Sequence, residues 1–104
     1  MNLGLNLGCV TFEWDARKAL ANLRKHQVAF EEAVTIFLDP LAATFPDPDH
    51  SLEESREITI GRTMEGRLVF VAHCGGDERV RIISARPTTR SERKQYEEGI
   101  GNQS

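Results

Sequence analysis

The sequence lacks any apolar run close to the roughly 20 residues that a helix needs to cross a bilayer. Residues 1–10 carry no positively charged start and no small-residue cleavage site, so they do not resemble a secretory leader. Cysteine is scarce as well: Cys9 and Cys74 lie far apart and fit neither a disulfide framework nor the spacing of a metal site. These absences predict a cytoplasmic protein that has no membrane partner.

The chain also lacks the common catalytic and nucleotide-binding motifs. It contains no glycine-rich phosphate loop, no dinucleotide fingerprint, no G-x-S-x-G elbow and no H-E-x-x-H pair, and its serines have no recognisable catalytic partners. Asp47, Asp49 and His50 form the one cluster that resembles metal ligands, but the prolines beside them are typical of an ordinary turn. We favour the turn, and we predict no metal site and no cofactor.

The length of 104 residues suits one domain with one modest core, so residues 1–104 are predicted to fold as a single unit. Residues 1–10 are either an extra N-terminal segment or a first strand. Residues 99–104 are predicted to be a flexible tail, because they follow the last amphipathic segment and are rich in glycine and polar residues.

The net charge of −3 argues against a protein that coats nucleic acid indiscriminately, but the charge is unevenly distributed. Residues 47–57 carry five acids and a single base, Arg56. Residues 79–94 carry one acid and six bases, namely Arg79, Arg81, Arg86, Arg90, Arg93 and Lys94. This basic segment is either an anion-binding surface or an ordinary solvated face, and charge alone does not decide between them.

Two short helices are predicted near the start of the chain. Asp15 suits the N-cap of a helix that ends near His26-Gln27, with Ala16, Ala19, Leu20 and Leu23 on its apolar face. In the second helix the apolar positions are Phe30, Ala33, Val34, Phe37 and Leu38, and Asp39-Pro40 ends it. With almost no linker between them, the two helices are expected to form a helical hairpin.

The remainder predicts strands at residues 42–45, 57–62, 68–73 and 80–85, separated by turn-forming residues. Thr89 and Glu92 match a capping box for a short last helix, which Gly99 is expected to stop. The predicted class is α+β, a two-helix N-terminal hairpin packed on a four- to five-stranded antiparallel sheet with a short C-terminal helix.

The candidate functional residues are basic. Lys25 and His26 lie in the last turn of the first helix, where the helix dipole favours cations; complementing that helix end is the simpler explanation for both. Arg62 continues an apolar strand face, and Arg86 shares parity with Val80 and Ile82 unless a bulge intervenes. An arginine in such a place must find an anion or reach solvent. A phosphodiester is one such anion, because the planar guanidinium can engage two phosphate oxygens.

The motifs FEWD at residues 12–15, KH at residues 25–26 and RIISAR at residues 81–86 occur in this order. Together with the segments around them, they resemble the BrnT family of toxins from type II toxin–antitoxin systems, over Thr11 to Glu98. The resemblance implies a RelE-like fold and cleavage of RNA that inhibits translation. It also implies neutralisation by a BrnA-type ribbon-helix-helix antitoxin, in a 2:2 heterotetramer that contacts operator DNA only through the antitoxin.

The resemblance further implies a metal-independent reaction in which the 2′-hydroxyl of RNA attacks the adjacent phosphate. The residues we assign to catalysis on this basis are Lys25, His26, Arg56, Arg62 and Arg86. The residues that we expect to bind the RNA backbone are Arg79, Arg81, Arg90, Arg93 and Lys94. Which of Lys25 and His26 acts as the base stays open.

A different class of function fits the same basic residues. The alternative is a non-catalytic module that uses the basic C-terminal strand and helix to bind a protein or DNA, with His26 and Arg62 in structural roles.

Overall fold

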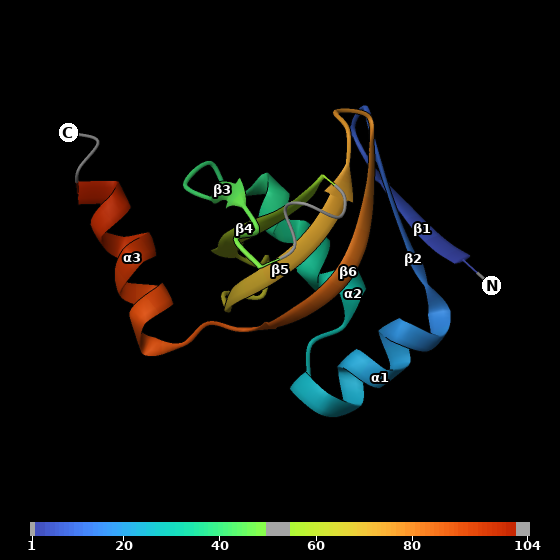
Figure 1. Cartoon of the computed structure of the whole chain (residues 1–104), viewed down its shortest axis with the longest axis horizontal. Coiled ribbons are helices and arrows are strands. Elements are labelled where there is room, and N and C mark those ends of the chain that lie inside the picture. The colour runs from blue at the N-terminus through green and yellow to red at the C-terminus, as the bar shows by residue number, and fades with distance from the viewer. Residues whose placement is uncertain (1, 50–54, 102–104) are drawn as a thin grey trace.

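The structure is a computed structural model that describes residues 2–49 and 55–101 of the chain (Figure 1). Its strands are β1 (Asn2–Leu7), β2 (Val10–Asp15), β3 (Ala43–Pro46), β4 (Arg56–Arg62), β5 (Leu68–Gly75) and β6 (Arg79–Pro87). Its helices are α1 (Ala16–His26), α2 (Phe30–Ala33), the 3₁₀ helix η1 (Val34–Leu38) and α3 (Arg90–Gly101). The strands of these described residues form one sheet in the order β1-β2-β6-β5-β4-β3. No helix in the same residues is long and apolar enough to span a bilayer.

The predicted architecture, an N-terminal helical hairpin on an antiparallel sheet of four or five strands, is wrong. The chain begins with the β1–β2 hairpin, and β2 pairs in parallel with β6 through residues 11–13 and 79–81, so the six-stranded sheet is mixed. Phe12 and Trp14 alternate with polar residues, which is the period of a strand, and both are buried. Residues 1–10 therefore contribute a first strand, one of the two alternatives considered for them.

The second predicted helix is broken into two pieces. α2 is a single turn, and η1 continues it as a 3₁₀ helix. Two features of the sequence explain the weak helix: Ala29 gives no side-chain cap at its start, and the β-branched run Val34, Thr35 and Ile36 is unfavourable inside an α-helix.

Helix α1 begins and ends as its sequence predicts. The Asp15 carboxylate accepts hydrogen bonds from the backbone N–H groups of Arg17, at 2.8 Å, and Lys18, at 3.2 Å. These bonds lower the pKa of Asp15. At the other end Gln27 adopts a left-handed conformation with φ 58°, and its N–H donates to the carbonyl of Leu23. The basic residues of the last turn include Lys25 and His26.

The buried face of α1 differs from the predicted one. Leu20 and Leu23 are 50% and 44% exposed, whereas Asn22 is only 8% exposed. The Asn22 amide donates to the carbonyls of Ala85, at 2.8 Å, and Val28, and its oxygen accepts from the N–H of Ala85. Asn22 thus bonds the backbone N–H and carbonyl of Ala85 on β6, beyond the residues that pair with β2. A neighbouring strand would otherwise fill this role. This contact fixes α1 beside β6.

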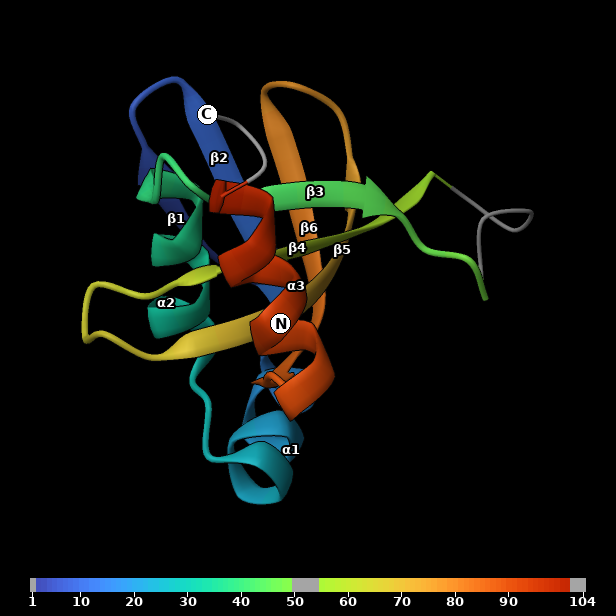
Figure 2. The same cartoon turned by 90° about the vertical axis from the view of Figure 1, so that its left-hand side faces the viewer.

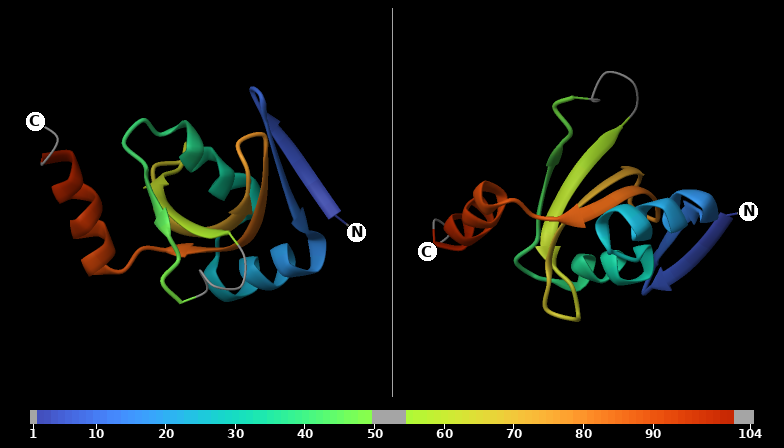
Figure 3. Two further views of the ribbon diagram at one scale, coloured as in Figure 1. Left: turned by 45° about the horizontal axis from the view of Figure 1, so that its top comes forward. Right: turned by 90° about the horizontal axis from the view of Figure 1, so that it is seen from below.

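The two faces of the sheet are covered unequally. On one face, α2 and η1 pack over a core that includes Phe12, Trp14, Phe30, Val71 and Ile82. On the other face a smaller cluster of residues from β4 and β5 meets Tyr96 of α3. Helices α1 and α3 lie at opposite ends of the molecule (Figures 1 and 3), and in the view of Figure 2 α3 lies in front of the sheet.

Helix α3 has the predicted capping box. The N–H of Thr89 donates to Glu92 Oε1 at 2.9 Å, and the N–H of Glu92 donates to Thr89 Oγ1 at 3.2 Å. The predicted stop at Gly99 is wrong, because the helix runs to Gly101; residues 102–104 of the predicted tail lie outside the described residues. Tyr96 anchors the helix by donating to Asp39 Oδ2 at 2.7 Å.

His73 makes stability depend on pH. Its ring is 5% exposed and its Nε2 lies 2.7 Å from the hydroxyl of Thr59, and burial lowers the pKa of His73 to about 4. The unfolded chain, with an ordinary histidine pKa of about 6.5, binds more protons in the interval between these values, so acid favours unfolding. We expect the free energy of unfolding to fall by up to about 1.4 kcal/mol per pH unit from about pH 6 to pH 5.

The measurement is urea unfolding across that interval, for wild type and His73→Asn. The asparagine variant is expected to be less stable at neutral pH but to show a clearly flatter pH dependence. The matched control is His26→Asn, which replaces a partly exposed histidine outside the contact between His73 and Thr59. An unchanged slope in His73→Asn would contradict the assignment.

Candidate functional site

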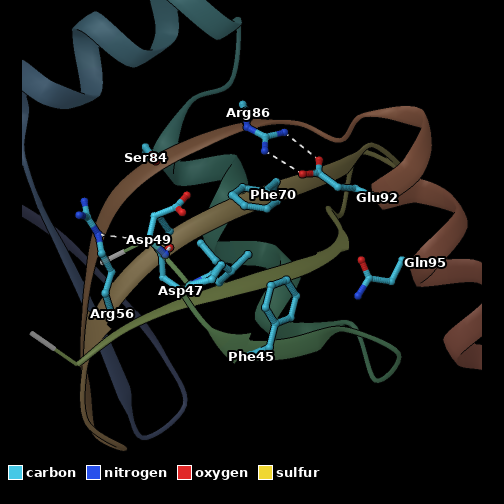
Figure 4. A pocket seen from close by; sticks show the side chains of 12 residues that line it. Phe45, Asp47, Asp49, Arg56, Phe70, Ser84, Arg86, Glu92 and Gln95 are labelled. Carbon is cyan, nitrogen blue, oxygen red and sulfur yellow. Dashed lines mark hydrogen bonds and ion pairs between the residues drawn. The ribbon is translucent and has the colours of Figure 1, made fainter. Parts of the chain in front are cut away.

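Three adjacent strands present side chains from one face of the sheet into a single hollow of about 470 Å³ (Figure 4). The register pairs Ile58 with Ala72 and Ala72 with Ser84, and it also pairs Phe70 with Arg86. The hollow is lined by Phe45, Asp47, Pro48, Asp49, Arg56, Ile58, Phe70, Ala72, Ser84, Arg86, Glu92 and Gln95. It therefore joins two of the predicted catalytic residues, Arg56 and Arg86, which are 30 positions apart in the sequence.

A register shift turns Arg86 toward this hollow. The pairing of β5 with β6 is irregular after Ala72, so that Ala72 lies opposite Ser84 while the next residue, His73, lies opposite Ile82. Val80 and Ile82 consequently face the larger core, whereas Ser84 and Arg86 face the hollow. The parity that would have put Arg86 with Val80 and Ile82 is broken by this bulge.

The Arg86 guanidinium is held on three sides. Its Nη1 and Nη2 each donate at 2.8 Å to an oxygen of Glu92, and Nη1 also donates to the carbonyl of Pro87. The group lies 3.9 Å from the centre of the Phe70 ring. The bond to Glu92 raises the pKa of Arg86, and the same bond lowers the pKa of Glu92. Arg86 is a fixed, partly neutralised cation.

Arg56 is held more loosely. Its Nε lies 4.0 Å from Asp47 Oδ2 and, among the described residues, has no hydrogen-bond partner although it is buried. Asp47 Oδ1 accepts the N–H of Asp49 at 2.9 Å, which is the geometry of the predicted turn. His50 lies outside the described residues, and within residues 2–49 and 55–101 no His, Cys, Asp and Glu side chains are grouped to hold a metal ion.

Lys25 and His26 line a second hollow of about 240 Å³, formed between α1 and β6. Lys18, Ala21 and Asn22 line it from the helix, and Ile83 and Ser84 line it from the strand. Ser84 also lines the larger hollow, so the two are neighbours on one side of the sheet. The Asn22 contact with β6 is what brings the Lys25-His26 pair to this side.

Arg62 lies apart from the other predicted catalytic residues. It is exposed, its Nη1 donates to the carbonyl of Gly66 at 3.0 Å, and its backbone N–H donates to Asp39 Oδ2. It lines a separate hollow with Leu38, Asp39 and Met64. The structure therefore does not bring Arg62 into contact with the hollow of Arg56 and Arg86.

None of the predicted RNA-binding residues lines the hollow. Arg81 is the register partner of Cys74, which in turn is opposite Arg56, so both arginines are on the same row of the sheet. Arg79 is exposed at the start of β6. The three on α3, Arg90, Arg93 and Lys94, are also exposed, and Lys94 Nζ lies 3.8 Å from Glu98.

Sequence reasoning identified Glu92 only as a helix cap and did not find its second role. The same carboxylate that caps α3 also binds Arg86, six residues earlier and across Pro87. It likewise missed Phe45 and Phe70 as lining residues. Both residues lie in predicted strands, but which face of the sheet stays open to solvent depends on where α3 packs.

The Arg86–Glu92 pair is expected to stabilise the fold. Glu92→Gln removes the charge that holds the partly buried Arg86 and weakens the cap of α3, so we expect a loss of about 1–3 kcal/mol in the free energy of unfolding. Denaturant unfolding measures it. Glu98→Gln on the same helix is the matched control, because the Lys94–Glu98 pair is exposed and should contribute less than about 1 kcal/mol. Equal losses in the two variants would contradict this assignment.

The sequence model of one family, described as ribonuclease toxin, BrnT, of type II toxin–antitoxin system, matches residues 14–92. A search of curated proteins gives no match. Among solved structures, the chain is similar to the Brucella abortus ribonuclease toxin BrnT, with 24% sequence identity and a TM-score of 0.57 over 74% of this chain and 94% of that one.

Proposed function

This chain belongs to the BrnT family of ribonuclease toxins of type II toxin–antitoxin systems, and from that membership we propose that it cuts RNA beside the Arg56–Arg86 hollow. The observation that supports this location is the convergence of Arg56 and Arg86 on one sheet face, with Lys25 and His26 in the adjoining hollow. Four basic side chains from three elements are thereby gathered along one side of a protein whose net charge is −3.

The proposed reaction needs no metal ion. The 2′-hydroxyl oxygen bonds to the adjacent phosphorus as the bond from phosphorus to the 5′-oxygen breaks, leaving a 2′,3′-cyclic phosphate and a 5′-hydroxyl. One of Lys25 and His26 accepts the hydroxyl proton, and the other donates a proton to the leaving oxygen. Arg56, whose Nε has no hydrogen-bond partner among the described residues, and Arg86 stabilise the charge that develops on the phosphoryl oxygens. Arg62 contributes less, since it lines a separate hollow.

The cellular role follows from the same membership. A type II system pairs the toxin with a protein antitoxin, and we propose a BrnA-type ribbon-helix-helix protein in a 2:2 complex, through which alone the toxin reaches operator DNA. Cleavage of RNA in the cytoplasm would inhibit translation. The cations Arg79 and Arg81 of β6 and Arg90, Arg93 and Lys94 of α3 are proposed to follow the RNA backbone; all are exposed except Arg81, which is partly buried.

Replacing Lys25 or His26 by alanine tests the proton-transfer roles. Each change is expected to lower kcat/KM for cleavage of single-stranded RNA by about 100-fold or more, and Arg56→Ala by a similar factor. Arg24→Ala is the matched control, because Arg24 is exposed in the same helical turn and outside both hollows. Full activity of both Lys25→Ala and His26→Ala would contradict the roles. RNA binding that persists with no cleavage by the wild type would favour the non-catalytic alternative.

Removal of divalent cations tests the metal-free reaction. Cleavage in excess chelator is expected to proceed at close to the untreated rate, and a substrate with a 2′-deoxyribose at the cleaved position is expected to resist cleavage. Product analysis should find the cyclic phosphate. Loss of activity in chelator, restored by added Mg²⁺ or Zn²⁺, would contradict the proposal and point to metal-assisted hydrolysis.

A further inference from the structure

The hollow beside Arg56 and Arg86 has an apolar floor that a phosphate does not need. Phe45, Ile58, Phe70 and Ala72 supply it, and Phe45 and Phe70 are only partly buried. A volume of about 470 Å³ lies within the range of about 300–1,000 Å³ that is usual for small-molecule sites. Exposed aromatic surface between charged groups is costly to leave in water, so this floor suits a flat, apolar-faced ligand.

The charges of the hollow also disfavour a phosphate inside it. Its lining holds three carboxylates, Asp47, Asp49 and Glu92, against the two guanidinium groups. Asp47 faces Arg56 and Glu92 binds Arg86, so each arginine already has an acid next to it. The third carboxylate, Asp49, is exposed at the rim and would repel a phosphate that enters the hollow. A neutral ring with its own amino groups would instead find an acceptor there.

We propose that this hollow binds one nucleobase of the RNA, stacked on Phe45, while the phosphate next to that base lies outside the hollow. The inference rests on the proposed ribonuclease function and deepens it, because it makes cleavage depend on the base. Phe45 is the stacking platform: it lines the hollow from the edge strand β3, whereas the Phe70 ring is already covered by Arg86 at 3.9 Å (Figure 4). Single-stranded bases are commonly recognised on such aromatic platforms.

The rim supplies groups that can read the base edge. The Asp49 carboxylate accepts hydrogen bonds, and Gln95 of α3, which is exposed, reaches the hollow with an amide that both donates and accepts (Figure 4). Cytosine, adenine and guanine carry an exocyclic amino group and uracil does not. The subsite should therefore disfavour uracil.

Binding of a non-cleavable RNA tests the subsite without relying on catalysis. The probe is a short 2′-O-methyl oligonucleotide, labelled for fluorescence anisotropy, in which each position in turn is made abasic. For the wild type we expect one position where loss of the base weakens binding at least about fivefold. In Phe45→Leu, which keeps an apolar side chain but no aromatic face, that penalty should shrink to less than about twofold, and Phe45→Tyr should restore it.

Two further variants keep the test decisive. Phe37→Leu is the matched control: Phe37 is also partly buried but packs on the opposite core, so the abasic penalty should be unchanged. Asp49→Asn changes an exposed rim residue, and the discrimination against uracil at the sensitive position should fall about fivefold while the abasic penalty persists. Even if Phe45→Leu fails to fold, either of two results overturns the proposal: no base-sensitive position in the wild type, or undiminished discrimination against uracil at that position in Asp49→Asn.

Cleavage of the matching 2′-hydroxyl RNA, measured in parallel, separates this inference from the proposed function. Base-dependent binding without cleavage would keep the subsite and overturn the ribonuclease assignment. Cleavage with no base-sensitive position would keep the ribonuclease assignment and overturn the subsite. If Phe45→Leu weakens binding of the antitoxin but leaves the RNA profile unchanged, the hollow is a protein interface and the nucleobase subsite is wrong.

Discussion

The irregular register between β5 and β6 is the constraint on which the arrangement of the site depends. A regular strand would place Val80, Ile82, Ser84 and Arg86 on one face, because side chains alternate along it. The shift after Ala72 divides them, with Val80 and Ile82 in the larger core and Ser84 and Arg86 on the open face. One inserted residue thus lets a single strand both complete a core and present a guanidinium to the surface, without burying that charge among Phe12, Trp14 and Phe30.

The open face then needs its charges held in place, and α3 does this through Glu92. The carboxylate binds Arg86 with two hydrogen bonds and caps the helix through Thr89, so the orientation of the cation and the start of α3 are coupled. Asn22 has the corresponding role at the other end, because its contacts with Ala85 fix the helix that carries Lys25 and His26. The Arg86–Glu92 and Asn22–Ala85 contacts, rather than one continuous core, therefore hold the two helices in place on either side of the site.

The sequence was sufficient for several local features and insufficient for the second helix and for strand pairing. Asp15 as a cap, the Thr89–Glu92 box and the strand containing Leu68 follow from side-chain chemistry and periodicity within a few residues, and the structure confirms them. The parallel pairing of β2 with β6 joins residues about 70 positions apart, and no local pattern specifies it. Likewise, no local pattern predicts the burial of Asn22, because its partner is the backbone of Ala85, which carries no sequence signal. Arg56 and Arg86 were identified as cations, but the hollow they share depends on the bulge.

The balance of charge in the hollow bears on how an acidic protein selects RNA. With a net charge of −3, long-range attraction to a polyanion is weak, and beyond a Debye length of about 8 Å at physiological salt it is largely screened. The cations that remain useful are therefore those at contact distance, on β6 and at the end of α1. These cations are few, and neighbouring carboxylates already neutralise part of their charge. Phosphate contacts alone would therefore give modest affinity. An apolar platform beside these cations adds binding energy that salt does not screen. A phosphate backbone without a base does not obtain this energy, so the choice of RNA depends on the base more than on charge.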